Sequence, residues 1–117
     1  MTNANGEKAV NDVIRLLDDD CARQILVETT SEPMSANELS ERCDVSLPTI
    51  YRRIDELGEH ELINEQTRAA PNGHHYSVYA AALDQVEIDI TEDGLELDLT
   101  TRERMVDRFT IFIEDVI

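Results

Sequence analysis

Apolar residues recur with helical spacing through the first half of the chain. Residues three and four positions apart share one face of an α-helix, and this spacing predicts helices over residues 10–17, 21–30, 35–43 and 46–60. One Asp of Asp18-Asp19-Asp20 suits the N-cap of the second helix. Glu32-Pro33 ends that helix, because a residue before proline avoids the helical conformation. Residues 1–6 are expected to be a frayed end.

The third and fourth predicted helices carry further start and stop signals. Ser35 and Glu38 have the spacing of a capping box, in which each side chain bonds the other's backbone. Asp44-Val45 forms a tight turn, and Ser46 caps the next helix. Pro48 fits its first turn, where no backbone donor is needed. Two helices joined by so short a turn predict a helix-turn-helix over about residues 35–60.

The period changes from that of a helix to that of a strand after the fourth helix. Residues 62–68 and 75–79 read as two strands, and the loop between them contains Asn72-Gly73, a strong hairpin signal. A β-hairpin that follows a helix-turn-helix is a wing, so we expect a wing at about residues 62–79.

A second hairpin is predicted from strict alternation of apolar and polar residues over 86–90 and 95–99. A two-residue turn at Asp93-Gly94 pairs Ile90 with Leu97 and Ile88 with Leu99, so that all the apolar side chains share one face. The same register places Asp89 opposite Asp98, with Glu87 and Glu96 near by. Such like-charge pairs are destabilising unless salt screens them.

A terminal helix is predicted after the second hairpin. Thr100 and Glu103 have capping-box spacing, and an apolar stripe follows at i, i+4, i+7 and i+11. The sequence therefore predicts an α+β, mainly α fold of one compact unit. Residues 1–83 form a winged helix-turn-helix in this interpretation, and residues 84–117 add an acidic hairpin and a dimerisation helix.

Composition changes the picture mainly through charge. The chain has 117 residues and a net charge of −16, from 26 acidic against 10 basic side chains. These values argue against a membrane protein, a secreted disulfide scaffold, a basic-tailed nucleic-acid binder and a large enzyme. Repulsion on this scale is relieved at molar salt, which favours a cytoplasmic protein of a salt-accumulating halophile. An ordinary acidic protein with a basic partner is the alternative.

Cysteine usage gives no metal or disulfide signal. Cys21 and Cys43 are the only two cysteines, and neither lies in a Cys-x-x-Cys or His/Cys cluster. A disulfide would be unusual in a reducing cytoplasm, so both are expected to be small, partly buried apolar residues.

The segment SANELSERCDVSLPTIYRRIDELGEHELI resembles the winged-helix transcription regulators of the ArsR type, and the resemblance extends over about residues 8–83. The acidic C-terminal hairpin and helix are similar to extensions of haloarchaeal members. The resemblance implies a recognition helix in the major groove and a wing on the backbone or minor groove of double-stranded DNA. The metal-sensing Cys-x-Cys pair of that family is missing, since this region holds only Cys43, and no metal or cofactor is expected.

The helix spacing selects residues that face DNA. With Ile50, Ile54 and Leu57 inward, the opposite face of the fourth helix points outward, and Arg and Thr can bond base edges. The predicted DNA-binding residues are Ser35, Ser46, Pro48, Thr49, Tyr51, Arg52, Arg53, Arg68, His74 and His75. Two alternatives stay open. The two adjacent arginines could pair with Asp55, Glu56 or Glu59, and the two histidines could be solvent-facing turn residues. Glu56 could oppose phosphate or accept from cytosine.

The distribution of acidic residues supports the same surface. The longest stretches without Asp or Glu are residues 66–83 and 45–54, which are the predicted wing and the start of the recognition helix. Residues 80–117 carry eleven acids against three Arg and should face away from DNA.

The apolar stripes of the first and last helices favour a homodimer, although the C-terminal stripe could instead be core. The predicted dimerisation residues are Val13, Leu16, Leu17, Met105, Phe109, Phe112, Ile113 and Val116. The sequence thus predicts a dimeric, sequence-specific DNA-binding regulator reading a pseudo-palindrome. A protein–protein adaptor of a transcription complex is the alternative, and no catalytic constellation suggests an enzyme.

Overall fold

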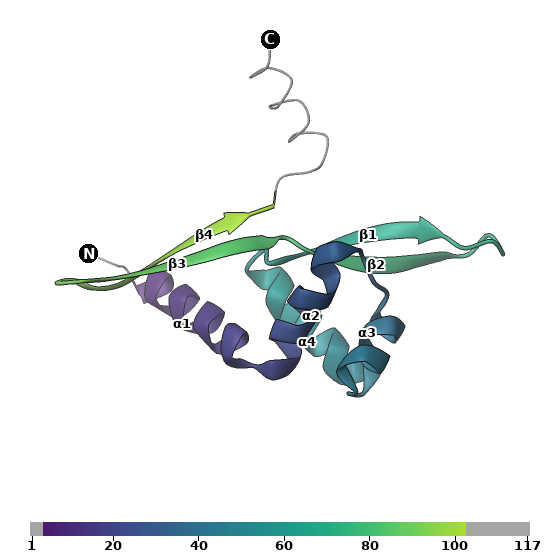
Figure 1. Cartoon of the computed structure of the whole chain (residues 1–117), viewed down its shortest axis with the longest axis horizontal. Helices are drawn as coiled ribbons and strands as arrows, with labels where there is room; N and C mark the ends of the chain where they lie inside the picture. Colours follow the sequence, from purple (N-terminus) through teal and green to yellow (C-terminus); the bar gives the residue numbers. More distant parts are fainter. Residues whose placement is uncertain (1–3, 103–117) are drawn as a thin grey trace, which may run out of the picture.

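The computed structural model describes residues 4–102. The helices are α1 Ala4–Asp18, α2 Asp20–Ser31, α3 Ala36–Cys43 and α4 Leu47–Glu59, and the strands are β1 Ile63–Ala69, β2 His75–Ala81, β3 Leu83–Thr91 and β4 Gly94–Thr101. Two antiparallel hairpins, β1–β2 and β3–β4, lie end to end, with the four helices along one side of them (Figure 1). The fold is therefore α+β, as predicted.

The boundaries of the first two helices follow from their local chemistry. The side chain of Asp19 caps α2 by accepting from the Ala22 amide at 2.8 Å, and Glu32 ends the helix in an extended conformation before Pro33. Both features were predicted. The start of α1 was predicted wrongly, because the helix begins at Ala4 rather than at Val10. Its first six residues carry no large apolar side chain, so the apolar spacing used for the prediction could not detect them.

The hydrophobic core joins all four helices to the first hairpin. Its fully buried members include Ile25, Leu39, Ile50, Leu57 and Leu62. The four on helices lie at positions where the helical spacing had placed an apolar residue inward, whereas Leu62 was predicted only as the start of a strand. The core therefore fixes how α3 and α4 sit against the β1–β2 hairpin.

Two of the predicted dimerisation residues belong to this same core. Val13 and Leu16 are only 2% and 6% exposed in the single chain. The core of the single chain already buries these side chains, which differs from the dimer contact expected of them. Leu17 is half-buried and packs on the edge of the core. Met105, Phe109, Phe112, Ile113 and Val116 lie outside the described residues.

The first hairpin matches its predicted position closely. β1 and β2 pair from Ile63 with Ala81 to Ala69 with His75. A tight turn follows Ala69, where Gly73 takes a φ of +86°, a conformation that favours glycine. Met34, between α2 and α3, bonds Tyr79 through both backbone groups at 3.0 and 2.7 Å. This bridge ties β2 to the segment that leads into α3.

The register of the second hairpin differs from the prediction by two residues. Ile90 pairs with Leu95 and Ile88 with Leu97, because the chain turns at Glu92-Asp93 and Thr91 pairs with Gly94. The Thr91 hydroxyl donates to the Gly94 carbonyl and accepts from the Asp93 amide, which stabilises this turn. A shift of two keeps every side chain on its face, so the alternation of apolar residues could not reveal it.

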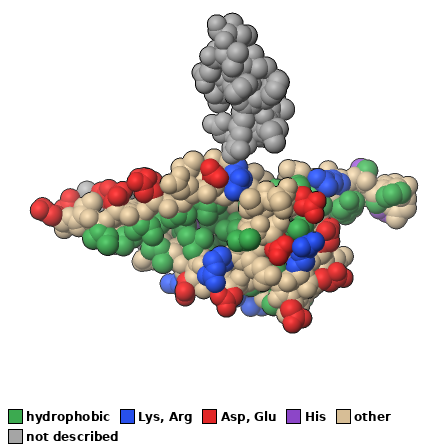
Figure 2. Space-filling view, in the orientation of Figure 1, with side chains coloured by type: hydrophobic (Ala, Val, Ile, Leu, Met, Phe, Trp, Pro, Cys, Tyr) green, Lys and Arg blue, Asp and Glu red, His purple; other side chains and the backbone are tan. Residues whose placement is uncertain are grey.

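The new register still opposes like charges. Glu87 pairs with Asp98 and Asp89 with Glu96, so four carboxylates share one face of the hairpin, and the apolar side chains share the other. Figure 2 shows acidic side chains along the outer edge of this hairpin and a hydrophobic band beneath it. The face-to-face arrangement of acids was predicted, although the partners were not.

Neutralising one of these carboxylates should stabilise the hairpin only in dilute salt. We expect Asp98→Asn to raise the free energy of unfolding by about 0.2–1 kcal/mol at 0.1 M KCl, and to change it little at 2 M, where salt screens the repulsion. Thermal unfolding at both salt concentrations measures this. Glu92→Gln is the matched control, because this turn residue removes the same charge without a cross-strand partner. Equal effects of the two variants would contradict the prediction.

The predicted start of the terminal helix is also corrected. Thr100 pairs with Gln85, and β4 continues to Thr101. A helix therefore does not begin at Thr100. The rest of the predicted helix lies outside the described residues. Within residues 4–102, no helix has both the length and the apolar character needed to cross a membrane.

Candidate nucleic-acid interface

The turn between α3 and α4 is built as the sequence predicted. Ser35 and Glu38 form both halves of a capping box at the start of α3. Asp44 ends the helix in the left-handed conformation with a φ of 53°, which Asp tolerates better than most residues. The Ser40 hydroxyl then donates to the Val45 carbonyl at 2.5 Å and holds the turn. Ser35, predicted to contact DNA, therefore stabilises the start of α3 in this structure.

The first turn of α4 differs from the prediction in one detail. Ser46 is at the N-cap position, but its side chain makes no capping hydrogen bond. Its hydroxyl instead lies 2.9 Å from the Thr49 hydroxyl. Pro48 has no amide and stands within the first turn, as expected. The start of α4 thus presents two linked hydroxyls to solvent together with its uncapped end.

Helix α4 has one buried apolar face and one exposed face. Ile50, Ile54 and Leu57 are buried in the core, and the opposite side of the first two turns exposes Pro48, Tyr51 and Arg52. Tyr51 is 46% exposed. Thr49 is half-buried on the flank. No ion pair within residues 4–102 engages Arg52, so its guanidinium is free to bind an external acceptor.

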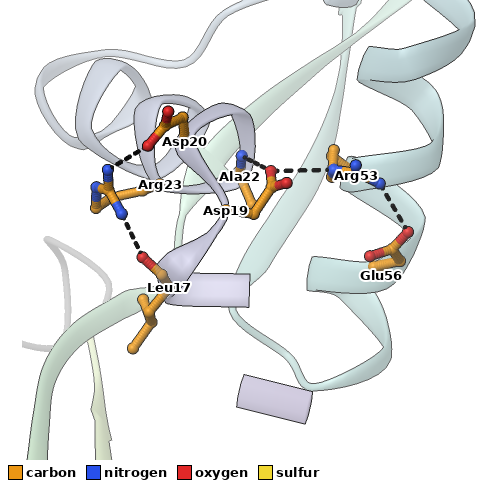
Figure 3. A network of polar contacts seen from close by, with 7 residues as sticks. All are labelled: Leu17, Asp19, Asp20, Ala22, Arg23, Arg53 and Glu56. Carbon is orange, nitrogen blue, oxygen red and sulfur yellow. Dashed lines mark hydrogen bonds and ion pairs between the residues drawn. The ribbon is translucent and has the colours of Figure 1, made fainter. Parts of the chain in front are cut away.

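Arg53 lies on the flank of α4, and its guanidinium forms ion pairs within the protein. Its Nε donates to Asp19 at 3.0 Å, and its Nη1 donates to Glu56 at 3.1 Å. Figure 3 shows Asp19 placed between the Ala22 amide and Arg53, so one carboxylate both caps α2 and holds α4. The alternative interpretation, that this arginine pairs with an acid, is confirmed for Glu56. Glu56 is thereby engaged by Arg53.

This network also changes the ionisation of its carboxylate. The hydrogen bond from the Ala22 amide is the largest influence and lowers the pKa of Asp19. Burial opposes it, and the hydrogen bond and the charge of Arg53 add to the lowering, so that the pKa lies below its ordinary value. Asp19 was recognised in the sequence only as one of three possible caps. Its contact with Arg53, 34 positions away, had no sequence signal.

The tip of the β1–β2 hairpin gathers the remaining candidates. Arg68, His74 and His75 are all exposed. The His74 amide donates to Asn72, so this residue belongs to the turn, whereas His75 begins β2. Tyr76 pairs with Arg68 across the strands and is 43% exposed. Tyr76 was not among the predicted DNA-binding residues, although its aromatic side chain close to the wing turn was a usable signal.

The acid-free stretches fall on these two exposed surfaces. One covers the start of α4, and the other covers the end of β1, all of β2 and the turn between them. On the face shown in Figure 2, acidic side chains crowd the β3–β4 end, and the far tip of the β1–β2 hairpin shows none. The charge of the molecule is therefore distributed unevenly along its length.

The order of elements, the three-residue turn and the buried face of α4 together define a helix-turn-helix arrangement. Residues 13–66 match the family model of a helix-turn-helix domain. This domain indicates a DNA-binding regulator. Among curated proteins, no relative matches the sequence. The match ends within β1, so the second half of the chain is described by its own geometry alone.

The helix-turn-helix domain carries no metal constellation in its described part. Residues 4–102 contain no group of three or more His, Cys, Asp or Glu side chains placed to hold a metal ion.

Proposed function

We propose that the protein is a sequence-specific, double-stranded-DNA-binding transcription regulator of the ArsR-like winged-helix type. The observation that best supports this proposal is the exposed, acid-free first half of α4. It bears Tyr51 and Arg52 shortly after the turn that joins α3 to α4. Recognition helices of this kind contact base edges with their N-terminal residues. Arg52 supplies a donor pair that suits guanine in the major groove.

The β1–β2 hairpin acts as the wing in this proposal. Arg68 is exposed near its tip and has no ion-pair partner in the described part of the chain, and His74 and His75 stand beside it. Arginine and turn amides in such a position bind phosphate and sugar groups, which position a protein without reading sequence. Arg52 therefore selects the operator, and Arg68 holds the duplex in place.

The proposed assembly is a homodimer. The apolar face of the β3–β4 hairpin leaves Ile88, Ile90, Leu95 and Leu99 exposed, Ile90 at 85%. These side chains form an apolar surface that a monomer does not cover within residues 4–102. A dimer of this type is expected to read a pseudo-palindrome, with half-sites about 34–36 Å apart as in other helix-turn-helix dimers.

The net charge of −16 gives the proposal an unusual salt dependence. Ordinary DNA-binding proteins lose affinity as salt rises, because counterions compete for the phosphates. Here salt also screens repulsion between the acidic surface and the duplex. We expect an affinity that stays level or rises between 0.1 and 2 M KCl, as suits a protein of a salt-rich cytoplasm.

Fluorescence anisotropy with the full chain tests the function. The probes are a duplex from upstream of its own gene, duplexes selected from a random pool, and a scrambled duplex. We expect tighter binding to a selected or upstream duplex than to the scrambled one, persisting at 2 M KCl. A folded dimer that binds none of them at any salt concentration would overturn the proposal and favour the protein–protein adaptor, whose acidic surface would take a basic partner.

A further inference from the structure

Two thiols meet beside the helix-turn-helix turn. Cys21 is the second residue of α2, and Cys43 is the last residue of α3, so folding brings together side chains 22 positions apart. The two thiols line the same cavity and lie close enough for each to affect the ionisation of the other. They are the only two cysteines of the chain, and each is half-buried against the core.

The surroundings hold the two thiols in place and open them to solvent. The Gln24 amide donates to the Arg42 carbonyl at 2.9 Å, and Arg42 pairs with Glu28 at 3.1 Å, so polar contacts fasten α2 to the end of α3 next to the thiols. Both cysteines also line an open cavity of about 790 Å³ together with Thr49 and Arg53 of α4. A small reagent can therefore reach the pair.

We propose that Cys21 and Cys43 are a dithiol modification site that closes reversibly to a disulfide by exchange with a low-molecular-weight disulfide. A metal ion is the less suitable occupant, because no third ligand joins the thiols among residues 4–102. A disulfide needs only two sulfur atoms and a backbone that lets them approach.

The exchange proceeds in two balanced steps. The Cys21 thiolate attacks one sulfur of the small disulfide, forming a mixed disulfide and releasing one small thiolate. Cys43 then loses its proton to solvent and attacks the Cys21 sulfur, which closes the protein disulfide and releases the second small thiolate. Two protein thiols are oxidised, and one small disulfide is reduced to two thiols.

The charges around the pair decide which thiol reacts first. Burial raises the pKa of both thiols, that of Cys43 to about 11. Asp19 and Glu28 oppose ionisation from the side of α2, whereas Arg53 and the neighbouring Cys43 thiol favour the thiolate of Cys21. Because the thiolate is the nucleophile, the reaction is slow at pH 7, and its rate rises about tenfold per pH unit below the pKa.

The disulfide would stabilise the turn between α3 and α4, which positions α4. Cys43 precedes Ser46, the N-cap of α4, by three positions, and Cys21 follows Asp19, which holds Arg53. A disulfide between them would join the start of α2 to the end of α3, next to the Asp19–Arg53 contact that links α2 to α4. The covalent link would also restrict the unfolded chain and so raise the stability of the oxidised protein.

The test is a redox titration of the full chain in glutathione and glutathione disulfide, once in native buffer and once in guanidinium chloride. Free thiols are trapped with a maleimide and counted by intact mass. We expect the native protein to form the intramolecular disulfide with an effective thiol concentration at least tenfold above that of the denatured chain. An equal or lower native value would mean that the two residues only fill space, and would overturn the proposal.

The variants and the pH dependence separate the roles of the two thiols. Cys21→Ser and Cys43→Ser should each yield only the mixed disulfide with glutathione, and circular dichroism checks that each variant is folded. We expect native disulfide formation to be about 30-fold faster at pH 8.5 than at pH 7.0, and Cys21→Ser to slow the first exchange more than Cys43→Ser does. A rate independent of pH, or the opposite order, would overturn the mechanism.

Discussion

Arg52→Ala should lower the affinity for the selected duplex by about 10- to 100-fold, the equivalent of 1–3 kcal/mol for a lost bidentate contact with guanine. The reason is structural. Arg52 stands exposed on the acid-free half of α4 and has no intramolecular ion pair within the described residues, so removal of its side chain should affect recognition rather than folding.

The measurement is anisotropy with a panel of duplexes that each carry one substituted base pair. Loss of the arginine should make the protein indifferent to one position of the panel and leave its other preferences intact. Arg68→Ala should instead weaken binding to selected and scrambled duplexes alike, since phosphate contacts carry no sequence information. Arg15→Ala on α1 removes the same charge from an exposed position outside the proposed interface and serves as the control. Equal losses for both variants on both duplexes would contradict this division of roles.

Asp19→Ala should be the most destabilising of the surface substitutions considered. We expect the free energy of unfolding to fall by about 1–2 kcal/mol, because the change removes the N-cap of α2 and leaves Arg53 with Glu56 alone. Denaturant unfolding measures the loss. Asp20→Ala is the matched control, because its carboxylate is 96% exposed and pairs only with the neighbouring Arg23, an interaction of small value.

The same carboxylate predicts a dependence on pH. Since the pKa of Asp19 is lowered in the folded protein, its stabilising effect is fully present above the ordinary carboxyl value of about 4 and is lost as pH falls through the lowered pKa. The wild type should therefore lose its advantage over Asp19→Ala as pH drops below about 4. A stability difference that stays constant down to pH 2 would show that the contact with Arg53 and the cap do not depend on charge.

Local chemistry explains why most elements could be predicted. The capping box at Ser35, the cap at Asp19, the end at Pro33 and the Asn-Gly turn each involve residues within a few positions of one another. The inward face of α4 follows from spacing alone, since apolar residues at i, i+4 and i+7 must meet the core. The exposed face, and with it Arg52, follows from the same spacing.

The failures have a physical cause as well. Alternation has a period of two, so it could not distinguish the observed partner of Ile90, Leu95, from the predicted partner, Leu97, two positions away. The first six residues of α1 carry no large apolar side chain, so they have no apolar spacing to detect. Val13 and Leu16 form part of an apolar stripe, and a stripe is the same whether it faces the core or a second copy.

The sequence by itself determined the order of the elements, the helix-turn-helix with its following hairpin, and the acid-free surface where nucleic acid is proposed to bind. Each of these depends on spacing, on caps or on composition, which act over a few residues. Only the tertiary structure decided that Arg53 binds Asp19, and that Cys21 and Cys43 line the same cavity. The residues of these two pairs lie 34 and 22 positions apart in the sequence, and their distance depends on how the core packs the helices together.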